Sequence, residues 1–327
     1  MDYYLAPMEG LTGYVFRKTY HSFYRGFDKY FTPFIAPTKK KVLKTREFKD
    51  VDPANNEGMK VIPQILTNDA DNFIDTVERL KHLGYYEVNL NLGCPSQTVV
   101  TKGKGAGFLD DPDRLDAFFE NVFDRLRKVR ISVKTRLGMD FSSEFFDILE
   151  VYNRYPFEEI IIHPRVREDY YAKKPDLATF AEALNKTDKD VCYNGDIFSQ
   201  EDAKRIISDY PKVKAIMLGR GILKNPRLLE EITNEKLGSL HEIEAFDPSS
   251  VEMDKERKRL KAFHDALLEG YVTDLSGERD VLFKMKEFWS YFLENFRDNP
   301  DFDKLMKKIK KSQSVLEYAV AANNLFK

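Results

Sequence analysis

The run Glu159-Ile160-Ile161-Ile162-His163-Pro164-Arg165 decides the fold class. Its three consecutive isoleucines leave no polar face, which is typical of a short parallel strand covered on both sides. The run Ala215-Ile216-Met217-Leu218 has the same character. Together with six other short β-rich runs, they predict eight strands, at residues 3–6, 30–35, 61–65, 86–91, 131–135, 159–163, 190–194 and 214–218.

Amphipathic segments separate several of these strands. Residues 69–83 place Phe73, Ile74, Val77 and Leu80 on one helical face, and Gly84 follows as a stop signal. The segments 113–128 and 199–209 have similar patterns. Alternating strands and helices predict parallel βαβ units. Eight such units favour an α/β fold of the (β/α)8 TIM-barrel type over an open doubly wound sheet.

The pattern changes after residue 235. Residues 249–270, 278–297 and 301–325 predict helices, with Gly270, Gly277 and Pro300 at their ends, and no further strand is expected. We therefore predict a catalytic barrel domain over residues 1–235 and a small helical bundle over residues 236–327.

Composition narrows the class of protein. The chain has 327 residues and a net charge of −2, without the excess of Lys and Arg common in nucleic-acid binders. Local basic clusters occur at Lys39-Lys40-Lys41, 255–261 and 304–311. No run reaches the roughly 18 apolar residues of a membrane helix, and the first residues do not resemble a signal peptide. We expect a cytoplasmic protein that does not bind a membrane.

The two cysteines, Cys94 and Cys192, lie far apart in the sequence, and neither belongs to a metal-binding motif. We expect free thiols and no metal site. Cys192 lies inside a predicted strand, where a cysteine usually acts as a small buried hydrophobe. Cys94 lies just beyond a strand, in a Gly-Cys-Pro turn, and a thiol that is mostly protonated at neutral pH can act there as a general acid.

Polar side chains recur at the end of nearly every predicted strand, where β/α barrels hold their active sites. The polar residues at these ends are Gln64, Asn91, Lys134, Arg136, His163, Arg165, Asn194, Asp196 and Arg220. Pro7, Met8, Gly195 and Gly219 lie at the same strand ends without a polar side chain.

These residue types suit one cofactor. Gly195 and Gly219-Arg220-Gly221 follow the last two strands, the usual phosphate site of such barrels. The amides of Gln64 and Asn91 suit a heterocycle with imide edges, and Lys134 offers a cation to an anionic reduced ring. We predict FMN. The alternative is that Lys134 pairs with a barrel carboxylate and that His163 is a core histidine.

The motifs resemble those of the dihydrouridine synthase family. They are Ala6-Pro7-Met8-x-Gly10-x-Thr12, the run from Tyr86 to Ser96 that contains Asn-Leu-Gly-Cys-Pro, Val133-Lys134-Thr135-Arg136, His163-x-Arg165, Asn194-Gly195-Asp196 and Gly219-Arg220-Gly221. The resemblance covers residues 1 to about 230 and departs at Gly13, where the family usually has Asp, and at Pro164, where it often has Gly.

The resemblance implies reduction of the C5–C6 double bond of particular uridines in tRNA, by hydride from NADPH or NADH through FMN. It implies that Cys94 is the acid. It assigns to the flavin Pro7, Met8, Gln64, Lys134, His163, Asn194, Gly195, Asp196, Gly219 and Arg220. It assigns to the RNA Asn91, Lys102, Arg136, Arg165 and Arg167. The helical domain would bind tRNA, with Lys304, Lys307, Lys308 and Lys311 as one basic face.

Two other functions remain open at this point. Another FMN-dependent TIM-barrel oxidoreductase, acting on a small molecule, would also explain the phosphate site and Lys134. A tRNA-binding chaperone without catalysis would keep the fold. The sequence does not indicate which uridine is modified. We expect a monomer with no obligate protein partner.

Overall fold

The computed structural model describes residues 1–38, 43–233, 251–297 and 299–326. The chain forms two compact units. The first comprises residues 1–9, 27–197 and 201–218, and the second comprises 10–26, 198–200 and the remainder from 219. The predicted domain boundary after residue 235 and the predicted cluster Lys39-Lys40-Lys41 lie outside the described residues. Each unit has its own buried apolar residues.

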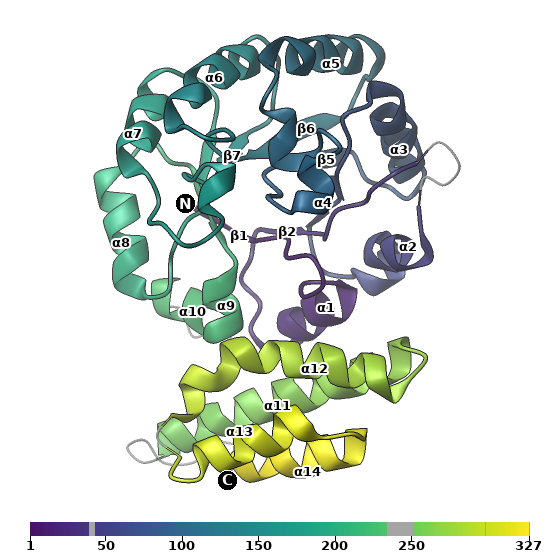
Figure 1. Cartoon of the computed structure of the whole chain (residues 1–327), viewed down its shortest axis with the longest axis vertical. Coiled ribbons are helices and arrows are strands. Elements are labelled where there is room, and N and C mark those ends of the chain that lie inside the picture. Colours follow the sequence, from purple (N-terminus) through teal and green to yellow (C-terminus); the bar gives the residue numbers. More distant parts are fainter. Residues whose placement is uncertain (39–42, 234–250, 298, 327) are drawn as a thin grey trace. The chain divides into compact units, whose positions relative to one another are not determined.

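A sheet of nine parallel strands, in the order β3-β2-β1-β9-β8-β7-β6-β5-β4, forms the first unit (Figure 1). The strands are β1 (Asp2–Leu5), β2 (Lys29–Phe31), β3 (Val61–Ile62), β4 (Gln64–Ile65), β5 (Glu87–Leu92), β6 (Arg130–Thr135), β7 (Ile160–Ile162), β8 (Val191–Tyr193) and β9 (Ala215–Leu218). Every predicted strand is present, and the predicted TIM barrel is confirmed.

Two prolines explain how the observed strands differ from the eight predicted: Pro63 divides one strand into two, and Pro33 shortens another. The predicted strand 61–65 is divided into β3 and β4 at Pro63, which has no backbone N–H to donate. The predicted strand 30–35 ends at Phe31, before Pro33, and its pairing resumes at Ile35, which bridges Ile65. Because β3 pairs with β2 and β4 pairs with β5, the same segment joins both ends of the sheet and closes the barrel.

Helices follow most of the strands and surround the barrel in Figure 1. They are α2 (Thr45–Val51), α3 (Ala70–His82), α4 (Gln97–Val100), α5 (Pro112–Arg125), α6 (Phe145–Asn153), α7 (Leu177–Asn185) and α8 (Gln200–Asp209). Aspartates begin three of them: Asp69, Asp111 and Asp176 each accept a hydrogen bond, at 2.9–3.0 Å, from the backbone N–H three residues later. These caps fix where α3, α5 and α7 start.

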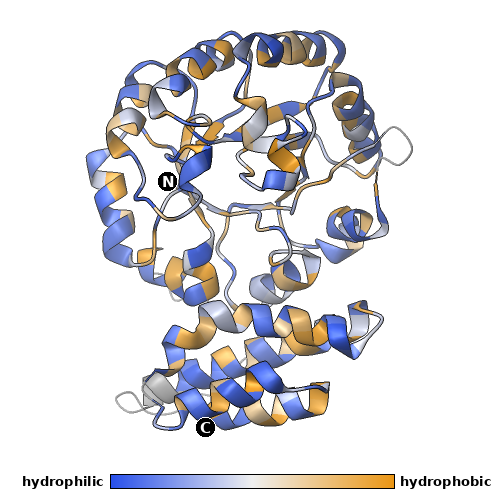
Figure 2. Ribbon diagram, in the orientation of Figure 1, coloured by the Kyte–Doolittle hydropathy of each residue, from blue (hydrophilic) through white to orange (hydrophobic). Residues whose placement is uncertain are grey.

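The barrel helices pack through the faces that the sequence predicted. Phe73, Ile74, Val77 and Leu80 of α3 are all buried. Figure 2 shows both hydrophobic and hydrophilic residues along these helices, as expected for elements with one buried face. The interior of the barrel is apolar in its middle, where Cys192 of β8 lies in a buried cluster with residues of β1, β2, β3, β7 and β9. Cys192 is fully buried, as expected for a core cysteine.

The second unit is helical. It contains α1 (Tyr14–Phe23), α9 (Arg220–Lys224), α10 (Leu228–Thr233), α11 (Val251–Asp274), α12 (Glu278–Phe292), α13 (Phe302–Lys311) and α14 (Val315–Leu325). The single helix predicted over 301–325 is wrong. The chain breaks between α13 and α14, because the Ser314 hydroxyl accepts the Glu317 N–H (3.2 Å) and starts a new helix.

Gly270 was predicted to end a helix but lies inside α11. A Cβ atom at this position would lie 2.7 Å from Cγ1 of Val15 on α1. The glycine therefore lets α1 and α11 approach closely. Phe16 of α1 packs in the same region, stacked on Phe288 with ring centroids 5.6 Å apart and edge-to-face with Phe263 at 6.0 Å. The packing that this close approach allows outweighs the cost of placing a glycine inside a helix.

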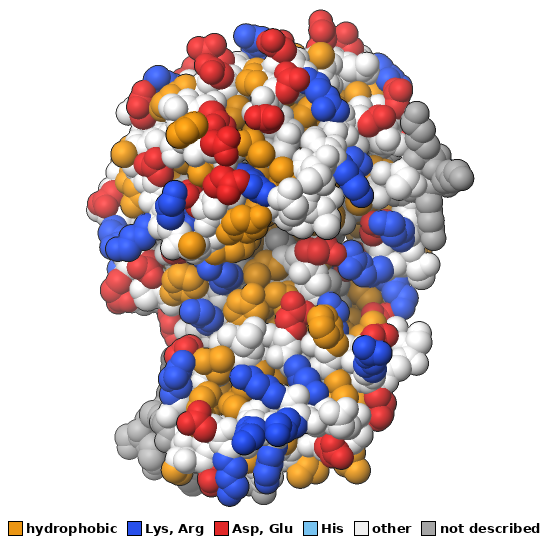
Figure 3. Space-filling model, viewed as in Figure 1, with side chains coloured by type: hydrophobic (Ala, Val, Ile, Leu, Met, Phe, Trp, Pro, Cys, Tyr) orange, Lys and Arg blue, Asp and Glu red, His pale blue; other side chains and the backbone are white. Residues whose placement is uncertain are grey.

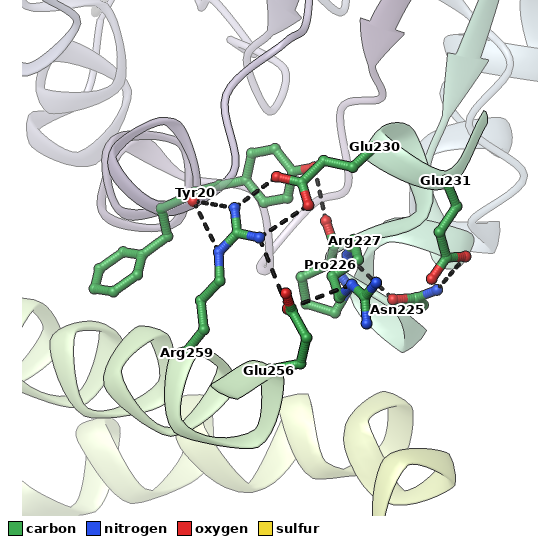
Figure 4. A network of polar contacts seen from close by, with 9 residues as sticks. Tyr20, Asn225, Pro226, Arg227, Glu230, Glu231, Glu256 and Arg259 are labelled. Atoms are coloured by element: carbon green, nitrogen blue, oxygen red, sulfur yellow. Dashed lines mark hydrogen bonds and ion pairs between the residues drawn. The ribbon is translucent and has the colours of Figure 1, made fainter. Parts of the chain in front are cut away.

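A buried arginine links three elements of this unit (Figure 4). Arg259 of α11 forms a bidentate ion pair with Glu230 of α10, at 2.6 and 2.8 Å, and donates to the carbonyl of Phe23 at the end of α1. Its guanidinium also lies 4.2 Å from the ring centroid of Tyr24. Because Arg259 is only 8% exposed, removing one partner would leave a buried charge without compensation.

None of the helices in the described ranges combines the length and the apolarity that a bilayer-spanning segment needs.

Candidate active site

The turn that carries Cys94 is held by Asn91, at the end of β5. The Asn91 Oδ1 atom accepts hydrogen bonds from the backbone N–H groups of Gly93 (3.1 Å) and Cys94 (2.9 Å). From the other side, the Ala106 N–H donates to the Cys94 carbonyl (3.1 Å). Gly105 has a φ of +57°, and a Cβ there would lie 2.8 Å from the Cys94 carbonyl oxygen. The loop can close on the cysteine only because residue 105 is glycine.

A chain of amides leads from the barrel interior to this turn. Ser132 accepts from the Asn89 Nδ2 (2.8 Å), the Asn89 Oδ1 accepts from the Gln64 Nε2 (2.7 Å), and the Gln64 Oε1 accepts from the Asn91 Nδ2 (2.7 Å). Gln64 and Asn89 are fully buried, and Asn91 is 8% exposed. Each predicted amide is therefore fixed in one orientation. Sequence reasoning missed Asn89 and Ser132, although the polar residues inside apolar strands were a signal.

Cys94 is a partly exposed free thiol at the edge of this network. Burial raises its pKa, and Glu9 acts in the same direction. A backbone hydrogen bond from Ser96 and the charges of Arg136 and Lys134 oppose the rise. Burial is the largest of these effects, so the thiol keeps its proton at neutral pH. It is therefore suited to donate a proton rather than to attack as a thiolate.

Lys134 lies beside Asn91 in the register of β5 and β6, at the same strand end as Cys94. Burial, with a smaller contribution from the Arg136 charge, lowers the pKa of its ammonium to about 8. Its side chain is partly exposed and forms no ion pair with any described residue. Lys29 of β2, by contrast, is paired with carboxylates, since its Nζ atom contacts Glu87 and Glu159 at 2.6 Å each.

His163, Arg165 and Asp196 form one network after β7 and β8. Arg165 is 1% exposed. Its Nη1 atom lies 3.0 Å from the His163 Nε2 and 3.1 Å from the Asp196 Oδ1, and its Nη2 lies 2.5 Å from the Asp196 Oδ2. Its Nε donates to the Lys173 carbonyl (2.6 Å). The structure thus brings these three predicted residues together, with Arg165 buried rather than extended toward solvent.

Arg136 is also buried, with 1% exposure. Its Nε, Nη1 and Nη2 atoms donate, each at 2.9 Å, to the carbonyls of Gly93, Val166 and Tyr170. It therefore ties the Cys94 turn to the loop after β7. Tyr170 has a φ of +47°, and Tyr171 is 52% exposed, with its ring centroid 5.4 Å from the Arg136 guanidinium and 5.8 Å from the His163 ring. Sequence reasoning missed this tyrosine pair.

The other predicted residues occupy several places. Asn194 donates from Nδ2 to the Met217 carbonyl (2.9 Å) and is followed by Gly195. Lys102 is exposed, and its carbonyl accepts from Asn68. Arg167 bonds Gln97 and Glu168. Pro7 and Met8 follow β1 after Ala6. Gly219 directly follows β9 and caps α9, which begins at Arg220, and both residues belong to the second unit. Their roles stay predictions.

Comparisons with known proteins relate the chain to one family. The family model described as dihydrouridine synthase matches residues 4–324. A protein named tRNA-dihydrouridine(16) synthase from Shigella flexneri is 28% identical over 232 residues, which cover 68% of this chain and 73% of the relative. One of the same name from Yersinia pestis is 27% identical over 308 residues, which cover 86% and 96%.

Among solved structures, morphinone reductase in complex with tetrahydroNAD aligns with a TM-score of 0.51 at 10% identity, covering 71% of this chain and 86% of that one. At that identity the likeness shows the barrel fold alone. The match of the family model extends over nearly the whole sequence, including the Cys94 turn and the helical unit. The chain belongs to the dihydrouridine synthase family.

Proposed function

We propose that this protein reduces the C5–C6 double bond of uridines in tRNA, with FMN as its bound cofactor and NADPH or NADH as reductant. The observation that carries the proposal is the pairing, at adjacent strand ends, of a protonated Cys94 thiol with a Lys134 ammonium that has no carboxylate partner among the described residues. An acid and an unpaired cation are what addition of a proton and a hydride to a uracil ring requires.

FMN fits the residues present. A cation with a pKa lowered to about 8 gains an anionic partner when a reduced flavin lies beside it. When bound, FMN supplies hydride to C6 of the uracil. Lys134, Gln64 and His163 would hold its ring system. Pro7, Met8, Asn194, Gly195, Asp196, Gly219 and Arg220 complete the predicted cofactor set. His163 and Gln64 already have fixed hydrogen-bond partners, so they enter the site preoriented.

Cys94 would donate its proton to C5 of the same ring. Asn91 holds the cysteine backbone and so places the thiol, in addition to its predicted contact with the uracil. Lys102 and Arg167, which are at least partly exposed, can contact the RNA around the flipped uridine. Arg136 and Arg165 donate mainly to protein groups, so we now expect both to act on the site through the loops and side chains that they hold.

The helical unit offers a surface for the RNA. Lys304, Lys307, Lys308 and Lys311 are exposed on α13, opposite its buried Leu305, Met306 and Ile309, and Figure 3 shows Lys and Arg side chains gathered on this face. We propose that this lysine face contacts tRNA phosphates. Replacing the four lysines by glutamine should weaken tRNA binding and reduce its salt slope by up to about three.

The control for this variant replaces Lys128, Lys186, Lys204 and Lys214 by glutamine, since these residues are exposed in the first unit and the change in net charge is the same. If both quadruple variants weaken binding equally, overall charge rather than the lysine face is responsible. If neither does, the face is not part of the RNA-binding surface.

The decisive experiment measures dihydrouridine in an unmodified tRNA transcript after incubation with the flavin-loaded protein and NADPH. We expect product with the wild type and with Cys192→Ala, and a loss of at least about a hundredfold in rate with Cys94→Ala. Mapping the product would identify the uridine, with position 16 as the first to examine given the names of the relatives.

Other outcomes point to the other functions. Flavin reduction by NADPH without any dihydrouridine, together with no binding of tRNA, would indicate an oxidoreductase for a small molecule. Binding of tRNA by a protein that takes up no flavin would indicate a chaperone. Sedimentation of the protein alone and with tRNA would test the expected monomer.

A further inference from the structure

The His163–Arg165–Asp196 network has a chemical consequence beyond holding a loop. Arg165 reaches both of its partners from a buried position, with a single Nη1 atom 3.0 Å from the His163 Nε2 and 3.1 Å from the Asp196 Oδ1. The two hydrogens of that Nη1 suffice for both contacts. Its Nη2 and Nε atoms are committed to Asp196 and to the Lys173 carbonyl. The guanidinium therefore cannot rotate without losing several hydrogen bonds.

A guanidinium has five donor hydrogens and no acceptor, and it stays protonated in proteins. The 3.0 Å contact between Arg165 and the His163 Nε2 is therefore a hydrogen bond only if Nε2 carries a lone pair. A proton on Nε2 would place two donors against each other beside a positive charge. Such a hydrogen bond requires a neutral ring with its one proton on Nδ1.

We propose that Arg165 is a positioning residue that holds His163 as the neutral tautomer protonated on Nδ1, and that Asp196 holds Arg165 in place for this task. Asp196 supplies a bidentate carboxylate, the geometry that best fixes a guanidinium. The proposal gives both residues a role other than the direct ligand contacts expected from the sequence.

The consequence for catalysis rests on the proposed function. A neutral imidazole can donate one hydrogen bond from Nδ1 without bringing a second acidic proton near the reacting ring. Cys94, whose pKa burial raises, then remains the acid of the site. Four of the five donor hydrogens of Arg165 face His163, Asp196 and Lys173, so we expect Arg165 to act through these groups rather than through a contact to RNA.

The test is ¹⁵N NMR of the full-length, flavin-free protein labelled at its five histidines. The His163 signals are assigned by their disappearance in His163→Gln. We expect the wild-type Nε2 to resonate as an unprotonated ring nitrogen and the Nδ1 as a protonated one. Arg165→Met should move both signals, by allowing the other tautomer or the imidazolium, and Asp196→Asn should move them in the same direction. Arg154→Met, at an exposed arginine paired with Asp116, is the matched control and should change neither signal.

The kinetic readout separates positioning from RNA contact. We expect Arg165→Met to lower turnover by between about tenfold and a hundredfold while tRNA affinity and its salt slope stay at the wild-type values. A wild-type His163 protonated on Nε2 would overturn the proposal. So would an Arg165→Met protein with unchanged His163 signals, or one with a reduced salt slope. If Arg165→Met does not fold, the wild-type and Asp196→Asn spectra decide. Because the spectra need neither flavin nor activity, they stand even if the proposed reaction is wrong.

Discussion

Lys134 should make the flavin-free protein less stable than it would be with an uncharged side chain there. Its pKa is lowered to about 8 by burial, whereas an unfolded lysine titrates near the usual value of 10.5. Between these values the unfolded chain binds more protons than the folded one, so stability rises as pH rises through this window. We therefore predict that Lys134→Met stabilises the flavin-free protein at neutral pH.

The size of the effect follows from the shift. A difference of about 2.5 pKa units corresponds to about 3 kcal/mol near pH 7, where both states are charged. At about pH 9.5 the destabilisation by Lys134 falls to only about 1.4 kcal/mol, because the lysine of the folded protein is already neutral. The advantage of Lys134→Met over the wild type should thus shrink by about 2 kcal/mol between these two pH values. The variant should also fail to bind FMN tightly.

Urea denaturation of both flavin-free proteins at the two pH values measures this difference. The pH dependence is the informative quantity, since any packing effect of methionine is the same at both. Lys174→Met, in a residue outside the strand-end site, is the control. An advantage that does not change with pH would refute the reasoning, because it would mean that the charge of Lys134 costs nothing in the folded state.

Three further predictions concern packing and pH. Gly270→Ala should destabilise the helical unit by about 1–3 kcal/mol, because its Cβ would lie 2.7 Å from Val15, and Val15→Ala should recover part of the loss in a double-mutant cycle read by thermal unfolding. Gly105→Ala should lower the free energy of unfolding by about 1–2 kcal/mol and slow dihydrouridine formation, since the added Cβ would displace the Cys94 turn. Full activity in a folded variant would show that the turn tolerates this displacement. Burial lowers the pKa of His264, so the free energy of unfolding should fall as pH falls below about 6.5. His264→Phe should reduce this pH dependence, as measured by urea denaturation at several pH values. A pH dependence equal to that of the wild type would contradict the prediction.

The barrel could be predicted because its signal is local. Apolar runs such as 160–162 and 215–218 can be recognised without knowledge of distant residues, and a polar residue follows each run within two positions: His163 after the first and Arg220 after the second. Pro33 and Pro63 also give a local signal, since proline has no N–H to donate to a neighbouring strand. Their effect on the closure of the sheet, however, depends on which strands are neighbours.

Contacts between distant residues could not be predicted. Arg136 and Arg165 look like RNA-binding arginines from their place after strands, but buried carbonyls and Asp196 take up their donors. Gly270 looks like a helix end, but it is the partner of Val15, some 255 positions earlier in the chain (270 − 15). In each case the sequence shows the residue type, while its use depends on a neighbour that only the fold supplies.

The path of the chain between the two units affects how the protein must be made. Helix α1 is translated early, yet Phe16 packs against Phe263 and Phe288, which are synthesised about 250 and 270 residues later. At ordinary synthesis rates this delay is roughly 10–50 s. During that time the aromatic face of α1 has no partner from its own unit. The nascent chain therefore exposes an apolar surface that can bind other proteins. A helical fragment expressed without residues 14–23 would expose the aromatic side chains that normally contact α1. Dividing the gene after the barrel would therefore give two fragments, each with an exposed apolar surface, and we expect both to aggregate.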